Sequence, residues 1–320
     1  ALLEDRGELA AAEAAYRRAD AGGQPDGAFG LGVMLHQRGD LAGARAAYER
    51  AERGGHGGAA SNLGVLLEEL GDAAGAQAAF RRADEHGEAA GALNLGVLLE
   101  EQGDLAGAQA AYRRADERGE GAGALNLGRL LEQRGDLRGA EAAYQRADQL
   151  GEATAAGSLG VLREQRDDLA GAESAYRRGD QHGDGAAAFY LGVLLEQRGE
   201  LAEAQAAYAR ADHRGHGGAA SNLGVLLEGI GDLPGALAAY RRADERGEAA
   251  GSVNLGVLLE EHGDLAGAEA AYRRADERGE RAGAKYLGQL LERRGDLPGA
   301  QAALERADRP GLAGRRPQRR

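Results

Sequence analysis

Apolar residues recur along this chain at helical spacing, and glycine interrupts them at fixed intervals. Residues 89–120 show the pattern in full. Leu95, Leu98 and Leu99 lie on one face of a helix, and Gly103 follows as a stop signal. The pattern therefore predicts a first helix that contains these leucines and ends near Gly103.

A second helix is predicted directly after this stop. The carboxylate of Asp104 has the right chemistry for an N-cap, because it can accept hydrogen bonds from the free backbone N–H groups of the first turn. Gly119 can adopt the left-handed conformation that closes a helix. Because almost no linker follows, neighbouring helices should be antiparallel. The apolar face of this helix consists of Leu105, Ala108, Ala111, Tyr112 and Ala115.

The helix pair repeats every 32 residues without an insertion or deletion. We therefore expect one solenoid domain over residues 1–312, with a partial repeat over 1–24 and nine full repeats over 25–312. Residues 313–320 form a basic tail that we expect to be disordered. The junctions are Gly39-Asp40, Gly71-Asp72, Gly103-Asp104, Gly135-Asp136, Gly231-Asp232, Gly263-Asp264 and Gly295-Asp296, with the variants Gly7-Glu8, Asp167-Asp168 and Gly199-Glu200.

A glycine recurs inside the first helix, at the position of Gly96. It should cost up to about 1 kcal/mol relative to alanine, so its recurrence needs a structural reason. We expect close approach of two helices at this glycine, with Tyr112 filling the remaining space. No repeat can bury its apolar face alone, so the repeats must stack.

The sequence resembles the tetratricopeptide repeat family at Asn94-Leu95-Gly96, Gly103-Asp104, Ala108, Tyr112 and Ala115. Residues 111–132 also resemble its Sel-one-like branch. The sequence departs from the family pattern in two ways. It has alanine at position 92, where the family has a bulky aromatic residue, and its linker is shortened. The resemblance implies an all-α, right-handed solenoid of tandem antiparallel helix-turn-helix repeats, with a concave groove lined by the first helices.

Two polar ladders are predicted to face this groove. The residues at the positions of Leu93, Asn94, Val97, Glu100 and Glu101 remain once the leucines are assigned to the core. Asparagine can donate to and accept from an extended peptide. The asparagine ladder is Asn62, Asn94, Asn126, Asn222 and Asn254. The carboxylate ladder is Glu68, Glu100, Glu132, Glu164, Glu196, Glu228, Glu260 and Glu292.

The carboxylate ladder favours a basic protein or peptide partner. The alternative is that both ladders are solvated helix faces copied by duplication. Duplication is visible on a larger scale, because residues 55–68 recur letter for letter at 215–228, five repeats later. Two similar surfaces in succession would suit a repetitive or extended partner.

Residues that depart from the repeat carry more specific information. Phe29, Phe189, Tyr190 and Tyr286 replace small or polar residues and are candidate interface anchors. Alternatively, they fill spaces between repeats. Arg129 and Lys285 interrupt the acidic wall and are candidates for setting the partner's register, although sequence drift explains them equally well.

Charge and composition exclude several other classes. The net charge of −13 disfavours nucleic-acid binding, and no apolar run approaches the length of a membrane span. Cysteine is absent, which removes disulfides and is compatible with the cytoplasm. His213 and His216 lack a third ligand for zinc, and the serines lack a His and acid partnership. We expect no enzyme activity, metal or cofactor.

The leading hypothesis is a scaffold or adaptor that holds an extended or helical segment of another protein. A second is that the array is the sensor or regulatory arm of a longer protein, because the chain begins within a repeat and without Met. A third is end-to-end self-association, because the last full repeat ends at Ala307-Asp308 without a polar capping helix.

Overall fold

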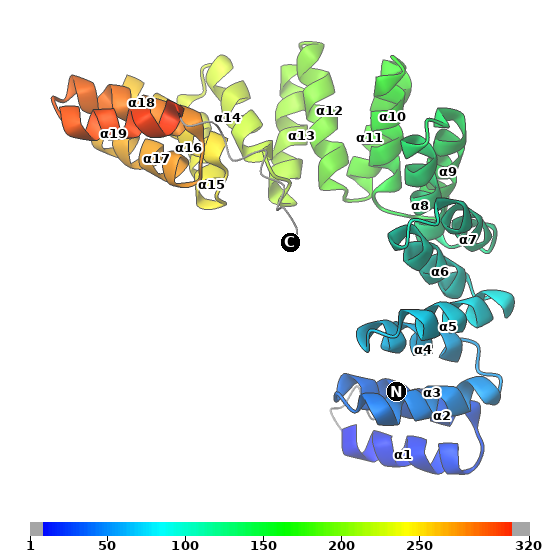
Figure 1. Cartoon of the computed structure of the whole chain (residues 1–320). Helices are drawn as coiled ribbons and strands as arrows, with labels where there is room; N and C mark the ends of the chain where they lie inside the picture. Colours follow the sequence, from blue (N-terminus) through cyan, green and yellow to red (C-terminus); the bar gives the residue numbers. More distant parts are fainter. Residues whose placement is uncertain (1–8, 309–320) are drawn as a thin grey trace. The chain divides into compact units, whose positions relative to one another are not determined.

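The computed structural model describes residues 9–308, which form nineteen helices and no strand (Figure 1). The predicted all-α solenoid of tandem helix pairs is confirmed in this range. The chain divides into two compact units, Ala1–Leu162 (unit 1) and Arg163–Arg320 (unit 2). The predicted tail, residues 313–320, and the first junction, Gly7-Glu8, lie outside the described residues.

Each full repeat contains one A helix followed by one B helix. The A helices are α2 (Pro25–Gln37), α4 (Ala59–Glu69), α6 (Ala89–Glu101), α8 (Gly121–Gln133), α10 (Ala155–Gln165), α12 (Gly185–Gln197), α14 (Ala219–Gly229), α16 (Ala249–Glu261) and α18 (Arg281–Arg293). The B helices are α1 (Leu9–Ala21), α3 (Leu41–Arg53), α5 (Ala73–Glu85), α7 (Leu105–Glu117), α9 (Leu137–Gln149), α11 (Leu169–Gln181), α13 (Leu201–His213), α15 (Leu233–Glu245), α17 (Leu265–Glu277) and α19 (Leu297–Asp308).

The predicted helix signals act as expected. The Asp104 carboxylate accepts a hydrogen bond from the Gly107 backbone N–H at 2.9 Å, and this cap recurs in most B helices. Gly103 has a φ of +82°, the left-handed conformation that ends the A helix. Asp167 stands at the equivalent place with a φ of 62°, a conformation that aspartate tolerates better than most residues.

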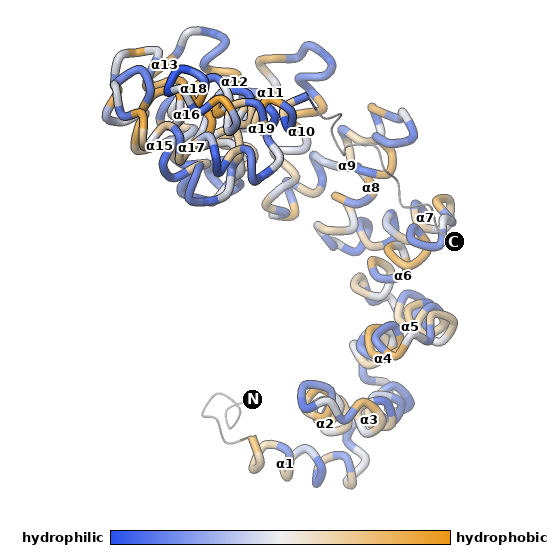
Figure 2. The backbone as a smooth tube through the Cα atoms, turned by 60° about the vertical axis from the view of Figure 1, so that its left-hand side comes forward, coloured by the Kyte–Doolittle hydropathy of each residue, from blue (hydrophilic) through white to orange (hydrophobic). Residues whose placement is uncertain are grey.

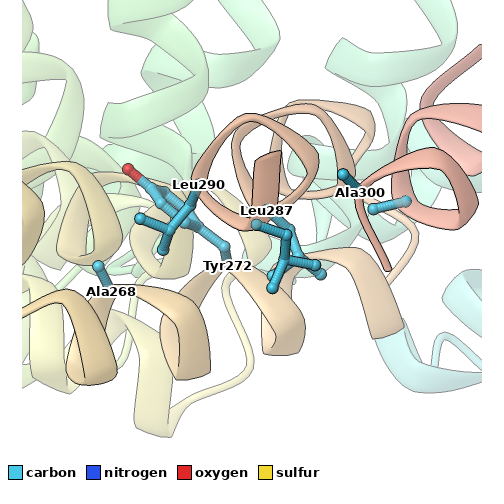
Figure 3. Close-up of a cluster of buried hydrophobic side chains, with 7 residues drawn as sticks. Ala268, Tyr272, Leu287, Leu290 and Ala300 are labelled. Atoms are coloured by element: carbon cyan, nitrogen blue, oxygen red, sulfur yellow. The ribbon is translucent and has the colours of Figure 1, made fainter. Parts of the chain in front are cut away.

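The interior glycine makes room for the tyrosine ring. A Cβ at Gly96 would lie 2.5 Å from Cδ1 of Tyr112, and that tyrosine is completely buried. Figure 3 shows the corresponding core around Tyr272, where leucines of α18 and alanines of α19 complete the packing. Hydrophobic and hydrophilic residues alternate along the helices in Figure 2, as expected when only one stripe of each helix faces such a core.

Within each unit, ion pairs connect successive B helices. Arg114 and Arg118 both bind Asp84 of the preceding B helix, at 2.5 and 2.6 Å. Their equivalents form a ladder along both units: Arg50–Asp20, Arg82–Glu52, Arg146–Asp116, Arg210–Asp180, Arg242–Asp212, Arg274–Asp244 and Arg306–Asp276.

The fit between glycine and tyrosine can be tested on one helix. Gly224→Ala in α14 would place a Cβ 2.4 Å from Cε1 of Tyr240, so we expect it to destabilise unit 2 by about 1–3 kcal/mol. Gly229→Ala on the same helix meets nothing within 4 Å and should be neutral or stabilising by a few tenths of a kcal/mol. Thermal unfolding followed by circular dichroism measures both. Equal stability of the two variants would contradict the packing explanation.

The ion-pair ladder makes stability depend on pH. Burial raises the pKa of the Asp180 carboxyl, but hydrogen bonds from Arg210 and Arg214 outweigh burial and hold it below its ordinary value of 3.8. The pair therefore stabilises the fold above that value and is lost as the pH falls through the lower folded-state pKa. We expect Asp180→Asn to cost about 1–3 kcal/mol near pH 7 and less near about pH 3.

The control for this measurement is Glu245→Gln, which removes the same charge from an exposed position on a B helix. Its melting temperature should stay close to that of the parent at both pH values. A destabilisation by Asp180→Asn that does not shrink at low pH would show that the carboxylate charge is not what stabilises the helix stack.

Candidate functional site

The A helices lie closer together than the B helices within each unit. The backbones of α4, α6 and α8 approach one another in turn within 8 Å, and so do those of α14, α16 and α18. We call the positions of Asn94, Val97, Glu100 and Glu101, with their equivalents at the repeat spacing, the A face. Because these A helices are neighbours, the A-face positions of α4, α6 and α8 adjoin one another, and so do those of α14, α16 and α18.

The asparagine ladder of the A face is half-buried in every repeat where it occurs. Two of its members also contact core tyrosines. Burial raises the pKa of Tyr48, and a hydrogen bond with Asn62 partly offsets this effect. Asn222 has the same relation to Tyr208. Part of the hydrogen-bonding capacity of the ladder is therefore used within the chain.

The carboxylate ladder is bonded to the buried tyrosines. The Tyr112 hydroxyl donates to Glu100 at 2.8 Å, so a hydrogen bond links the buried ring directly to a charge on the A face. Burial and this hydrogen bond both raise the pKa of Tyr112. The same bond joins Tyr144 to Glu132, Tyr176 to Glu164, Tyr208 to Glu196, Tyr240 to Glu228 and Tyr272 to Glu260, at 2.7–2.9 Å.

Two members of the ladder lack a tyrosine partner. Phe80 and Leu304 stand where the other repeats have tyrosine, so Glu68 and Glu292 have no hydroxyl to bind in their own repeat. Burial raises the pKa of Glu68, and the nearby charge of Glu101 raises it further. At Glu100, by contrast, the hydrogen bond from the Tyr112 hydroxyl acts to lower the pKa of the carboxyl.

Arg129 already occupies one place on the A face. Its guanidinium binds Glu100 at 2.7 Å, through the same Oε2 atom that accepts the Tyr112 hydroxyl. The three side chains line a cavity of about 390 Å³ together with Val97, Glu101 and Asn126. Lys285, the other predicted interruption of the acidic wall, is exposed on α18.

The four non-consensus aromatic residues divide into two pairs. Phe29 packs on Ala28, Ala51 and Ala59, and its ring stacks on His56 with centroids 3.9 Å apart. Phe189 does the same five repeats later, on Ala188, Ala211, Ala219 and His216. Both phenylalanines thus fill space between repeats, which was the alternative interpretation of their occurrence.

The two non-consensus tyrosines instead present rings at the surface. Tyr190 is 39% exposed and stacks on Tyr176 with centroids 5.7 Å apart. Tyr286 is 37% exposed and stacks on Tyr272 at 5.5 Å. Both occupy the asparagine position of the A face, so each replaces a polar side chain by an accessible aromatic surface.

One apolar cavity escaped the sequence interpretation. It has a volume of about 450 Å³ between α15 and α16 and is lined by Leu233, Pro234, Leu237, Leu258, Leu259 and His262. The equivalent junctions carry the ion pairs Glu173–Arg198 and Glu269–Arg294. Leu237 is the sequence feature that could have indicated this cavity, because most other repeats have Gln or Glu at its position.

Other kinds of site find no support within residues 9–308. No cluster of three or more His, Asp or Glu side chains in this range could hold a metal ion. His213 is exposed, whereas His216 stacks on Phe189. None of the nineteen helices has the length and apolarity needed to cross a membrane.

Solved structures with a similar arrangement of helices include those of two repeat proteins. One is c5321, a protective antigen of uropathogenic Escherichia coli strains displaying an SLR fold; it is 24% identical, and the match covers 91% of this chain and 70% of that one with a TM-score of 0.66. The other is a Sel1 repeat protein from Oxalobacter formigenes, with 21% identity, 68% and 97% coverage and a TM-score of 0.55. No curated protein matches the sequence.

Family models described as tetratricopeptide repeat match most of the array. One matches residues 2–60, 94–153 and 222–285, which is more than half of the chain, and a second matches 57–82 and 286–306. The matched segments contain the glycine-tyrosine core and the aspartate caps of most repeats, whereas residues 154–221, which include Glu164, Tyr190 and Glu196, lie outside them. With its 32-residue helix pairs and a fold similar to that of Sel1-like repeats, the chain belongs to the tetratricopeptide repeat family.

Proposed function

We propose that this protein is a non-catalytic scaffold that holds an extended or helical segment of another protein on the A face of its repeats. Tetratricopeptide repeats generally serve as protein-interaction scaffolds. The observation that carries the proposal is the set of accessible apolar and aromatic side chains on the A face of each unit. Val65 and Val97 belong to unit 1, and Tyr190, Val225 and Tyr286 belong to unit 2; each is between 37% and 49% exposed.

A folded chain gains nothing by placing such side chains in water, and exposed apolar surface rimmed by polar groups is typical of interaction sites. The rim here consists of the half-buried asparagines and the carboxylates bonded to tyrosine. An extended or helical segment could therefore bury its own apolar side chains on the valines and tyrosines, and its polar groups could pair with the rim.

Charge supports a partner of basic character. The chain carries a net charge of −13, and the A face adds a row of partly buried carboxylates in consecutive repeats. Complementary charge would speed the encounter with a basic segment and disfavour acidic competitors. The two similar five-repeat blocks would suit a partner with a repeated or extended sequence.

Affinity purification with matched variants tests the proposal. The double variant Tyr190→Ala and Tyr286→Ala removes two exposed rings and leaves the buried core intact, so we expect it to lose at least about tenfold of the bound partner. Phe189 is unsuitable for this purpose because it packs between repeats. Mass spectrometry of proteins bound from the cell of origin, quantified against the parent chain, measures the loss.

The control changes two exposed residues on B helices, Arg113→Ala and Arg241→Ala. This variant should retain the partners that the parent chain binds. If both variants retain the same proteins in the same amounts, the A face is not the binding surface and the proposal fails.

A further inference from the structure

Arg129 shows what kind of side chain the A face can bind. It extends from α8 to the carboxylate of Glu100 on α6, which belongs to the preceding repeat. The Tyr112 hydroxyl donates to the same carboxylate oxygen, Oε2, at 2.8 Å. Burial raises the pKa of Glu100, but the hydrogen bonds from Arg129 and Tyr112 together bring it below its ordinary value. The site therefore consists of the Glu100 carboxylate, which the Tyr112 hydroxyl holds in place and the Arg129 guanidinium binds.

A second arginine of the chain behaves in the same way. Arg293 of α18 forms an ion pair with Glu260, and Glu260 accepts a hydrogen bond from Tyr272 at 2.9 Å. Arg293 occupies the Glu101 position of its repeat, whereas Arg129 occupies the Val97 position. Two arginines that reach the A face from different positions thus bind the same kind of tyrosine-bonded carboxylate.

The intervening repeats have this carboxylate without an arginine. Glu196 and Glu228 of unit 2 accept hydrogen bonds from Tyr208 and Tyr240 at 2.7 Å. At the position of Arg129 these repeats carry the usual valine, as Val225 and Val257. Within the described part of the chain, neither carboxylate forms an ion pair.

Glu164 begins this row, and an aromatic surface lies beside it. It accepts a hydrogen bond from Tyr176 at 2.7 Å, and the exposed ring of Tyr190 stacks on Tyr176. A guanidinium is planar, can bind a carboxylate through two N–H groups and stacks on aromatic rings, whereas an ammonium is a compact and strongly hydrated charge. The combination of fixed carboxylate and flat ring therefore favours arginine over lysine.

We infer that Glu164, Glu196 and Glu228, each held by its tyrosine, are arginine-binding subsites for a basic segment of the partner protein. Arg129 is an internal occupant that closes the equivalent subsite at Glu100. The inference rests on the proposed function, because it names the chemistry by which the A face would recognise its partner. The valines between the carboxylates would contact the aliphatic stems of the bound arginines.

Synthetic peptides test the inference on the full chain. One peptide alternates arginine with alanine, a second has lysine in place of each arginine, and a third has glutamate. Fluorescence anisotropy at an ionic strength of about 0.15 M, where long-range attraction is screened, gives the affinities. We expect the arginine peptide to bind at least about fivefold more tightly than the lysine peptide, and the glutamate peptide not to bind.

Two variants are expected to change the affinity for the arginine peptide in opposite directions. Glu196→Gln with Glu228→Gln keeps an acceptor for each tyrosine hydroxyl but removes two charges, so the affinity for the arginine peptide should fall roughly tenfold. Arg129→Val frees Glu100 and should raise the affinity a few-fold, a gain that misfolding cannot produce. Arg273→Val is the matched control, because it makes the same charge change next to Glu269 on a B helix.

The outcomes separate the subsites from general charge attraction. If Arg273→Val raises the affinity as much as Arg129→Val, or if the two peptides bind equally, the inference is wrong. If the arginine peptide does not bind while the Tyr190 and Tyr286 variant still loses its natural partners, the proposed function stands and only the arginine subsites are rejected. Retention of those partners together with binding of the peptide would reject the A face as the natural docking surface.

Discussion

The contact between an interior glycine and a tyrosine ring determines much of this structure. Most A helices lack a side chain where the tyrosine of the following B helix enters, and a Cβ there would overlap the ring, as at Gly96 and Tyr112. The glycine lowers the intrinsic stability of the A helix. Packing of the tyrosine ring into the space beside the glycine offsets this loss. Neither helix of a pair is therefore stable in this form alone. The same dependence continues from pair to pair, because the repeats share their cores.

The tyrosine also connects the core to the surface that we propose as functional. Its ring is buried, but its hydroxyl reaches a carboxylate on the A face in six of the repeats. This bond limits the freedom of the glutamate and holds a charge at the boundary between the core and water. A carboxylate fixed in this way loses less conformational entropy on binding than a free surface glutamate does. Core packing and recognition chemistry are thus not independent in this array.

The helices and their ends could be predicted from sequence because their signals are local. Asp104 and Gly103 act through their own backbone neighbours, so the cap and the left-handed stop were predicted correctly. The ion pairs of Asp84 with Arg114 and Arg118 were missed, because they join residues 30 and 34 positions apart. Their formation depends on how one B helix lies beside the next, which no local signal specifies. The hydrogen bond from tyrosine to the glutamate ladder was also missed, because it joins side chains 12 positions apart on the two helices of a pair.

The unusual residues are best understood as pairs that span a repeat boundary. Phe29 stacks on His56, and Phe189 stacks on His216, in both cases 27 residues along the chain. Where serine replaces the phenylalanine, as in Ser61–Glu88 and Ser221–Glu248, glutamate replaces the histidine and a hydrogen bond replaces the stack. A departure from the repeat that has such a compensating partner is explained by packing between neighbours. Tyr190 and Tyr286 each keep an exposed ring face although they stack on core tyrosines. Positions that packing does not explain are the ones where a partner protein can account for the residue, and on this chain they lie together on the A face.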